Sequence, residues 1–123
     1  MNLLSIDYGT KRIGLAISVN DIIEPISGIK NDPNIFNNLK NIINQYKIEK
    51  IYVGLSEGHF AELTKKFVEE LKNVLILPIE TVEEAVTTIE AEEIYFSNRN
   101  KKKNYKKNID SVAAAVILRR VIS

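Results

Sequence analysis

The order of strand-like and helical segments limits the possible folds of this sequence more than any other feature. Three apolar, strand-like segments come first, at residues 2–7, 12–18 and 22–30. A short link that contains Gly9 joins the first two, which predicts a hairpin with antiparallel pairing. Pro25 lies in the third segment and cannot donate a ladder hydrogen bond, so this strand is expected at an edge of the sheet.

The rest of the chain alternates helical and strand-like patterns. Asp32 and Pro33 predict the start of a helix, because an acid suits the N-cap and proline suits the first helical position. The segments expected after this helix are a strand at 50–55, a helix at about 59–72, a strand at 73–79, a helix from about residue 82 and a last helix at about 109–121. Strands that alternate with helices pair in parallel through right-handed crossovers. The predicted fold class is therefore α/β, a five-stranded mixed sheet with three antiparallel strands and then parallel strands, flanked by helices.

The length of 123 residues fits a single domain that spans residues 1–123. The chain has no cysteine, which excludes a disulfide framework and a thiolate metal site. No apolar run approaches the roughly 20 residues that a membrane-spanning helix needs. The first residues also lack the basic start and the long apolar run of a signal peptide. We therefore expect a cytoplasmic protein that does not bind a membrane.

Acidic residues follow the predicted strands at the edge where α/β proteins bind ligands. Asp7 ends the first strand, and Glu80 ends the fifth, with Glu83 and Glu84 just beyond it. Ligands of open α/β sheets bind outside the carboxyl ends of the parallel strands. If the first, fourth and fifth strands are parallel neighbours, one of these glutamates can approach Asp7. Asp110 opens the last helix, and the run of alanines that follows it would let this helix pack close to the sheet.

A group of carboxylates without cysteine ligands suggests a hard divalent cation. Mg²⁺ prefers oxygen ligands, and two such ions can clamp both oxygens of a phosphodiester displacement. Each acid also has a simpler interpretation. Asp7 could form a salt bridge with Lys11 or Arg12, and Asp110 could be an ordinary N-cap that the helix dipole favours. Spacing alone leaves both interpretations open.

Positive charge gathers in one short segment, although the formal net charge of the chain is only +1. This basic block comprises Arg99, Lys101, Lys102, Lys103, Lys106 and Lys107. Such a block can contact phosphates even in a nearly neutral protein. The alternative is a solvated loop without a partner, which charge alone favours.

Four segments together resemble the YqgF/RuvX family, whose members are described as pre-16S rRNA nucleases and also as Holliday junction resolvases. The segments are, in order, IDYGTKRIGLAIS, IYVGL, VEEAVTTIEAEE and KKNIDSVAAAVIL. The first and last are specific motifs, whereas the middle two are looser. The resemblance covers the chain from Asn2 to about Arg119 and implies an RNase H-like fold.

The resemblance also implies an active site of three acids. Asp7 matches the acid of the first motif, Glu84 the glutamate before the Thr-Thr pair, and Asp110 the acid before the alanine-rich last helix. These residues would be catalytic and would bind one or two Mg²⁺ or Mn²⁺ ions. Lys11, Arg12 and the basic block would contact nucleic acid.

The implied activity is hydrolysis of phosphodiester bonds at the 5′ end of pre-16S rRNA, by a monomer or a weak homodimer. The sequence departs from the family in its middle motif, where Ala85 replaces an arginine and Glu83 an aspartate. The polar loop that the family has after the residue matching Leu55 is also missing. Two alternatives therefore stay open: a Holliday junction resolvase that acts on DNA, and a catalytically weakened factor that binds nucleic acid or assists ribosome assembly.

Overall fold

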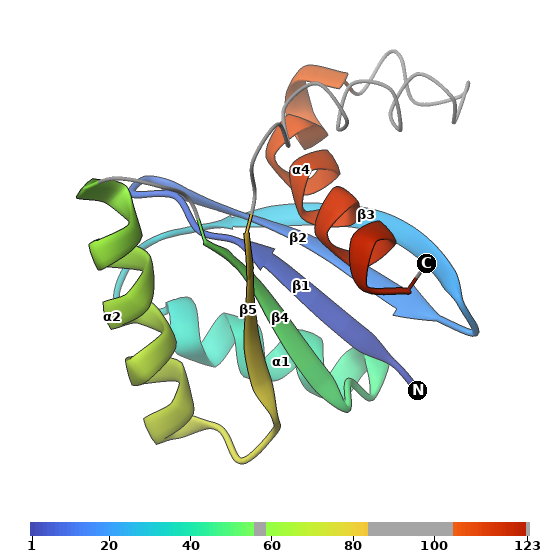
Figure 1. The fold of residues 1–123 in the computed structure, drawn as a ribbon, viewed down its shortest axis with the longest axis horizontal. Helices are drawn as coiled ribbons and strands as arrows, with labels where there is room; N and C mark the ends of the chain where they lie inside the picture. The colour runs from blue at the N-terminus through green and yellow to red at the C-terminus, as the bar shows by residue number, and fades with distance from the viewer. Residues whose placement is uncertain (56–58, 84–104, 123) are drawn as a thin grey trace.

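The computed structural model describes residues 1–55, 59–83 and 105–122 (Figure 1). The described elements are, in chain order, β1 (Leu3–Asp7), β2 (Arg12–Val19), β3 (Ile22–Lys30), α1 (Ile35–Tyr46), β4 (Lys50–Leu55), α2 (His59–Val74), β5 (Ile79–Glu83) and α4 (Tyr105–Ile122). No helix in these ranges is long and apolar enough to cross a membrane.

The strands form one mixed sheet in the order β3-β2-β1-β4-β5. β1 pairs antiparallel with β2, and β2 pairs antiparallel with β3. β4 pairs in parallel with β1, and β5 in parallel with β4. This arrangement confirms the predicted fold, including the edge position of β3, the strand that contains Pro25.

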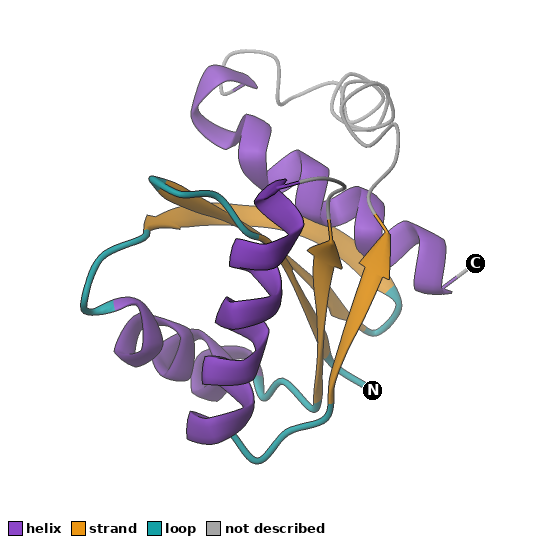
Figure 2. Cartoon of the chain, turned by 60° about the vertical axis from the view of Figure 1, so that its left-hand side comes forward, coloured by secondary structure: helices purple, strands orange, loops and turns teal. Residues whose placement is uncertain are grey.

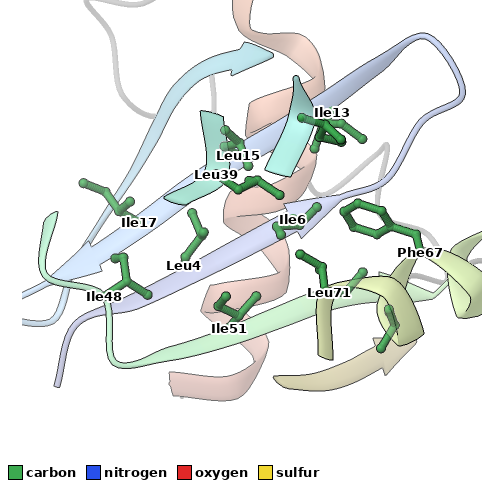
Figure 3. Packing of buried hydrophobic residues seen from close by; sticks show 13 residues of the cluster. Leu4, Ile6, Ile13, Leu15, Ile17, Leu39, Ile48, Ile51, Phe67 and Leu71 are labelled. Atoms are coloured by element: carbon green, nitrogen blue, oxygen red, sulfur yellow. The ribbon is translucent and has the colours of Figure 1, made fainter. Parts of the chain in front are cut away.

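Helices cover both faces of the sheet. Figure 2 shows α4 on one face and the pair α1 and α2 on the other. Alternation along β1 divides its side chains between the faces, because successive strand residues point to opposite sides. Leu4 and Ile6 belong to the cluster that packs under α1 and α2 (Figure 3). Ser5, between them, contacts α4.

The helix α4 lies close to the sheet because small side chains meet there. Ala114 and Ala115 pack against Ala16 of β2 in a second buried cluster. The hydroxyl of Ser5 donates a hydrogen bond to the carbonyl oxygen of Ala114. These contacts hold α4 close to the sheet, as the alanine run predicts, and place it over β1 and β2.

The predicted strand at 73–79 is wrong. The helix α2 continues to Val74, and β5 begins only at Ile79 and ends at Glu83. Between them, Ile76 is fully exposed, with 102% relative accessibility. The carbonyl of Pro78 accepts a hydrogen bond from the N–H of Ile51, which brings the chain into the sheet at that point. A short apolar run does not reveal its own secondary structure, and neighbouring elements decide it.

Two predicted helix starts are also wrong. Residue Asp32 lies before α1, where its carboxylate accepts a 2.9 Å hydrogen bond from the N–H of Asn34. This acid therefore closes a turn that leads into the helix, and α1 begins at Ile35. Residue Val82 lies in β5, and the rest of the helix predicted to start there falls outside the described residues.

Candidate active site

The last residue of β1, Asp7, lies between two glycines of the neighbouring strands. Its Cα partners are Gly14 on β2 and Gly54 on β4. Directly paired residues point to the same face of a sheet, so neither neighbour places a side chain beside Asp7. By alternation Asp7 shares the face of Ser5, which is the face that α4 covers. Asp7 is half-buried at the carboxyl edge of the sheet, and no side chain of its two paired neighbours lies beside it.

A β-bulge lies next to Asp7. On β2 only Gly14 separates Ile13 from Leu15, whereas two residues of β3, Ser27 and Gly28, separate their partners. A Cβ atom on Gly28 would lie 2.7 Å from the carbonyl oxygen of Ile13, so this position has no room for a side chain. Bulges of this kind bend a strand and often lie beside active sites.

The bulge anchors the helix that carries Asp110. The N–H of Leu15 donates a 3.2 Å hydrogen bond to the hydroxyl of Ser111. Leu15 pairs with Ile6, the residue before Asp7. Ser111 therefore fixes α4 beside the carboxyl end of β1, and Asp110 is the residue just before it.

The position of Asp110 excludes one simple interpretation. Because α4 begins at Tyr105, Asp110 lies inside the helix and is not its N-cap. It precedes Ala114 by one helical turn, and Ala114 is bonded to Ser5. This position is on the side of α4 that packs against β1, at the end where Asp7 lies. The side chain of Asp110 is not among those that the structure describes.

The third predicted acid, Glu84, falls outside the described residues, but the strand that leads to it is described. β5 ends at Glu83, which pairs with Leu55 of β4. The guanidinium of Arg120 on α4 donates a 2.8 Å hydrogen bond from Nη1 to the carbonyl oxygen of Glu83. Hence α4 also holds the end of the strand from which Glu84 follows.

One of the other glutamates is engaged elsewhere. Glu80 pairs with Tyr52, which lies two residues before Gly54, the partner of Asp7 on β4. The carboxylate of Glu80 forms a 3.3 Å salt bridge with Lys50. The side chain of Tyr52 first, and Glu80 second, raise the pKa of Lys50 above its usual value. Of the three glutamates considered as neighbours of Asp7, Glu80 is therefore the one whose carboxylate Lys50 holds.

Two cations lie where β1 turns into β2, Lys11 in the turn and Arg12 at the start of β2. Lys11 and Arg12 are both exposed. Asn31 holds this turn, since its side chain donates a 2.8 Å hydrogen bond to the carbonyl of Gly9 and its N–H donates a 2.9 Å bond to the carbonyl of Lys11. A Cβ atom on Gly9 would collide with the carbonyl of Arg12, so the turn requires glycine.

The basic block is divided between undescribed and helical residues. Arg99, Lys101, Lys102 and Lys103 lie outside the described residues. Lys106 and Lys107 lie in the first turn of α4, which corrects the prediction of a loop there. The structure does not describe their side chains.

Sequence reasoning missed three residues that hold the candidate site together: Asn31, Ser111 and Arg120. Ser111 gave a weak signal, because a small polar residue follows the predicted acid of the last helix. The other two gave none, since their partners Gly9 and Glu83 lie 22 and 37 residues away.

Solved structures of Holliday junction resolvases share this fold. RuvC from T. thermophilus, in complex with a Holliday junction substrate, matches with a TM-score of 0.60 at 14% identity, over 98% of this chain and 96% of that chain. The fowlpox virus Holliday junction resolvase matches with a TM-score of 0.62 at 17% identity, over 99% and 97%. At such identities the likeness shows the fold alone, which is RNase H-like as the family resemblance implies.

Similarity in sequence is higher to a group of bacterial proteins. A protein of Sulfurihydrogenibium sp. (strain YO3AOP1), named "Putative pre-16S rRNA nuclease", is 40% identical over 126 residues, which cover 94% of this chain and 86% of that protein. A protein of Dictyoglomus turgidum with the same name is 36% identical over 134 residues, which cover 99% and 94%. The model of the RuvX family, described as Holliday junction resolvase, matches residues 1–123. The chain belongs to the RuvX family.

This membership confirms the predicted family and adds one fact about length. The alignment with the D. turgidum protein spans 134 positions, whereas this RuvX chain has 123 residues. That relative therefore carries residues that this chain lacks. A missing loop after Leu55 remains the prediction for their place.

Proposed function

We propose that this RuvX protein is a metal-dependent endonuclease that hydrolyses phosphodiester bonds of RNA and processes the 5′ end of pre-16S rRNA in the cytoplasm. The observation that carries the proposal is the placement of Asp7. This acid ends a central strand at the carboxyl edge, paired on both sides with a glycine, Gly14 and Gly54. The names of the bacterial relatives support the choice of substrate.

The donor atoms at this edge fit a hard cation. The chain has no cysteine, and the two acids placed here on described elements, Asp7 and Asp110, supply only oxygen ligands. Mg²⁺ and Mn²⁺ prefer such ligands. Among the described side chains no three His, Asp or Glu residues are grouped to hold a metal ion, and Asp7 is the only predicted ligand among them. Asp7, Asp110 and Glu84 would together hold one or two ions.

The protein's own groups have separate roles in the proposed reaction. A bound divalent cation would supply Lewis-acid activation of the phosphodiester and of the attacking water. Asp7 would orient the cation from a rigid strand end, and α4 would bring Asp110 to the same edge. Lys11 and Arg12, on the turn that Asn31 holds, would contact phosphates of the bound strand.

A cleavage assay with a matched variant tests the proposal. Asp7→Asn removes a charge but keeps the shape of the side chain, so Mn²⁺-dependent cleavage of a pre-16S rRNA 5′ segment should fall at least about a hundredfold. Asp21→Asn is the control, because Asp21 lies in the β2–β3 turn at the opposite edge, and asparagine tolerates its positive φ of 64°. Equal cleavage by the Asp7→Asn variant and the parent protein would refute the proposal.

Hydrolysis of four-way DNA junctions is the second candidate, because the family model carries that description. A resolvase should act as a symmetric dimer, whose two sites match the two strands cut at the junction. The active protein should therefore be offered single-stranded RNA, structured rRNA precursor and a four-way DNA junction. Preference for the junction, together with a dimer in sedimentation, would favour the second candidate.

Retained binding of RNA with no metal-dependent cleavage would instead support a non-catalytic assembly factor. Ala85 and the missing loop after Leu55 are the features of this chain that favour such a factor.

A further inference from the structure

A groove of about 370 Å³ opens at the carboxyl end of β1, on the face opposite Asp7. Its walls include Tyr8, which directly follows Asp7, and residues of the β3–α1 loop, α1 and α2. The size falls in the range of small-ligand sites, which are lined by aromatic side chains and a few polar groups. None of the residues of the proposed metal site lines this groove.

Aromatic rings form a rigid platform in the groove. The ring of Phe67 is buried, with 5% relative accessibility. The centroid of the Tyr8 ring lies 4.5 Å from the centroid of the Phe67 ring. The ring of Phe36 stacks on Phe67 with a centroid distance of 6.1 Å. Tyr8 and Phe36 are only half-buried, so part of each ring faces the groove. Rings that are held in place by a packed neighbour can stack on a base without losing conformational freedom.

The charges in the groove decide which ligand suits it. The N-terminal end of α1 borders the groove, but the Asp32 carboxylate already accepts the N–H of Asn34 there. Glu70 adds a second carboxylate, and Lys66 is the one cation among the lining residues. Two acids against one lysine disfavour a phosphate. Carboxylates do accept hydrogen bonds from the amino groups of nucleobases.

We propose that this groove binds an unstacked nucleobase that carries an exocyclic amino group, from a single-stranded segment of the nucleic acid. The inference rests on the proposed function for the identity of the polymer. The turn with Lys11 begins after Tyr8, which lines the groove, and Asn31, another lining residue, is bonded to that turn. The backbone would follow Lys11 to the cleavage site, and the base would turn into the groove.

Binding of short oligonucleotides without metal tests the stacking. The probe is a fluorescently labelled decamer of adenylates in EDTA, which prevents cleavage, and anisotropy gives the Kd. Phe36→Leu keeps an apolar side chain but removes the ring, so the Kd should rise about five- to tenfold. Tyr46→Leu is the control, because Tyr46 packs against the same core from the far end of α1 and does not line the groove. Equal Kd values for Phe36→Leu and Tyr46→Leu would overturn the proposal.

Two single substitutions that each remove one negative charge at an exposed position of α2 test base selectivity. Glu70→Gln alters an exposed lining residue, and Glu69→Gln alters its exposed neighbour outside the groove. The parent protein should bind the adenylate decamer more tightly than a uridylate decamer, and only Glu70→Gln should reduce that ratio, about threefold or more. The same ratio in all three proteins would overturn the amino-group recognition.

The outcome separates this inference from the proposed function. If Asp7→Asn abolishes cleavage and Phe36→Leu raises the Kd as expected, both the nuclease function and the base-binding groove are supported. If the parent protein cleaves RNA but neither Phe36→Leu nor Glu70→Gln changes binding, the proposed nuclease function stands and the base-binding groove is refuted. If the variants change binding as expected but the parent protein does not cleave RNA, the base-binding groove is supported and the nuclease function is refuted.

Discussion

Arg120 on α4 donates a hydrogen bond to the carbonyl oxygen of Glu83, the last residue of β5, over 2.8 Å. Ser5 on β1 donates to the carbonyl of Ala114 in the middle of the same helix, and the N–H of Leu15 on β2 donates to Ser111 near its start. A single helix is thereby bonded to three strands. Two of the proposed acids lie on β1 and on α4, and the third follows β5, so the register of α4 sets where all three can meet.

Replacement of Arg120 should weaken metal binding more than folding. Arg120→Met removes the hydrogen bond that holds the end of β5, and supporting groups of this kind change metal affinity by about tenfold. Titration calorimetry with Mn²⁺ should show that loss, and a urea melt should show a small change in the free energy of unfolding. Lys72→Met, at an exposed cation in the last turn of α2, is the control. If both variants bind Mn²⁺ like the parent protein, Arg120 has no positioning role.

The buried serines should differ in their contributions to stability. Ser111→Ala leaves the N–H of Leu15 buried without its partner, which costs about 1–3 kcal/mol. Ser5→Ala should cost less, about 0.5–1.5 kcal/mol, because the carbonyl of Ala114 lies inside a helix and accepts a helical hydrogen bond as well. Chemical denaturation measures both.

Ser18 provides the internal comparison for these two serines. Its hydroxyl is buried and finds no partner among the residues that the structure describes. Ser18→Ala should therefore leave stability unchanged or raise it. A loss for Ser18→Ala as large as that for Ser111→Ala would show that burial, rather than the hydrogen bond, explains the effect.

A methyl group at the bulge should disturb the site. Gly28→Ala would place a Cβ atom 2.7 Å from the carbonyl of Ile13 and 3.7 Å from the hydroxyl of Ser111. Overpacking of this kind costs about 1–3 kcal/mol, and the movement it requires lies beside Asp7. Denaturation should show the loss, and Mn²⁺ affinity should fall with it. Ser27→Ala, at the exposed neighbouring position of the bulge, should change neither quantity.

The salt bridge of Lys50 should make stability depend on pH at alkaline values. Tyr52 and Glu80 raise the pKa of Lys50 above its ordinary 10.5, so the folded state holds this proton more tightly than the unfolded state does. The stabilisation is fully present below pH 10.5 and is lost as the pH rises through the higher folded pKa. The difference in unfolding free energy between the parent protein and Lys50→Met should therefore shrink above that pH. A difference that stays constant from pH 7 to the alkaline limit would contradict the assignment.

Local patterns in the sequence were sufficient for much of the fold. The bounds of β3 and β4 agree with the predictions, because turn residues and apolar runs mark them directly. The edge position of β3 follows from Pro25, whereas the pairing of Asp7 with Gly14 and Gly54 is known only from the structure. The family motif then assigns Asp7 a role, which stays a prediction, as do the roles of Glu84 and Asp110.

Contacts between distant residues decided the rest. The run at 73–79 is apolar enough for a strand, but α2 extends into it and β5 pairs with β4 only from Ile79. The hydrogen bonds that position α4 join residues 109, 96 and 37 positions apart. A periodic pattern reports which face of an element is buried, but it does not report which element covers that face. The register of α4 over β1, which sets where Asp110 lies along the sheet, is therefore a property of the packed structure alone.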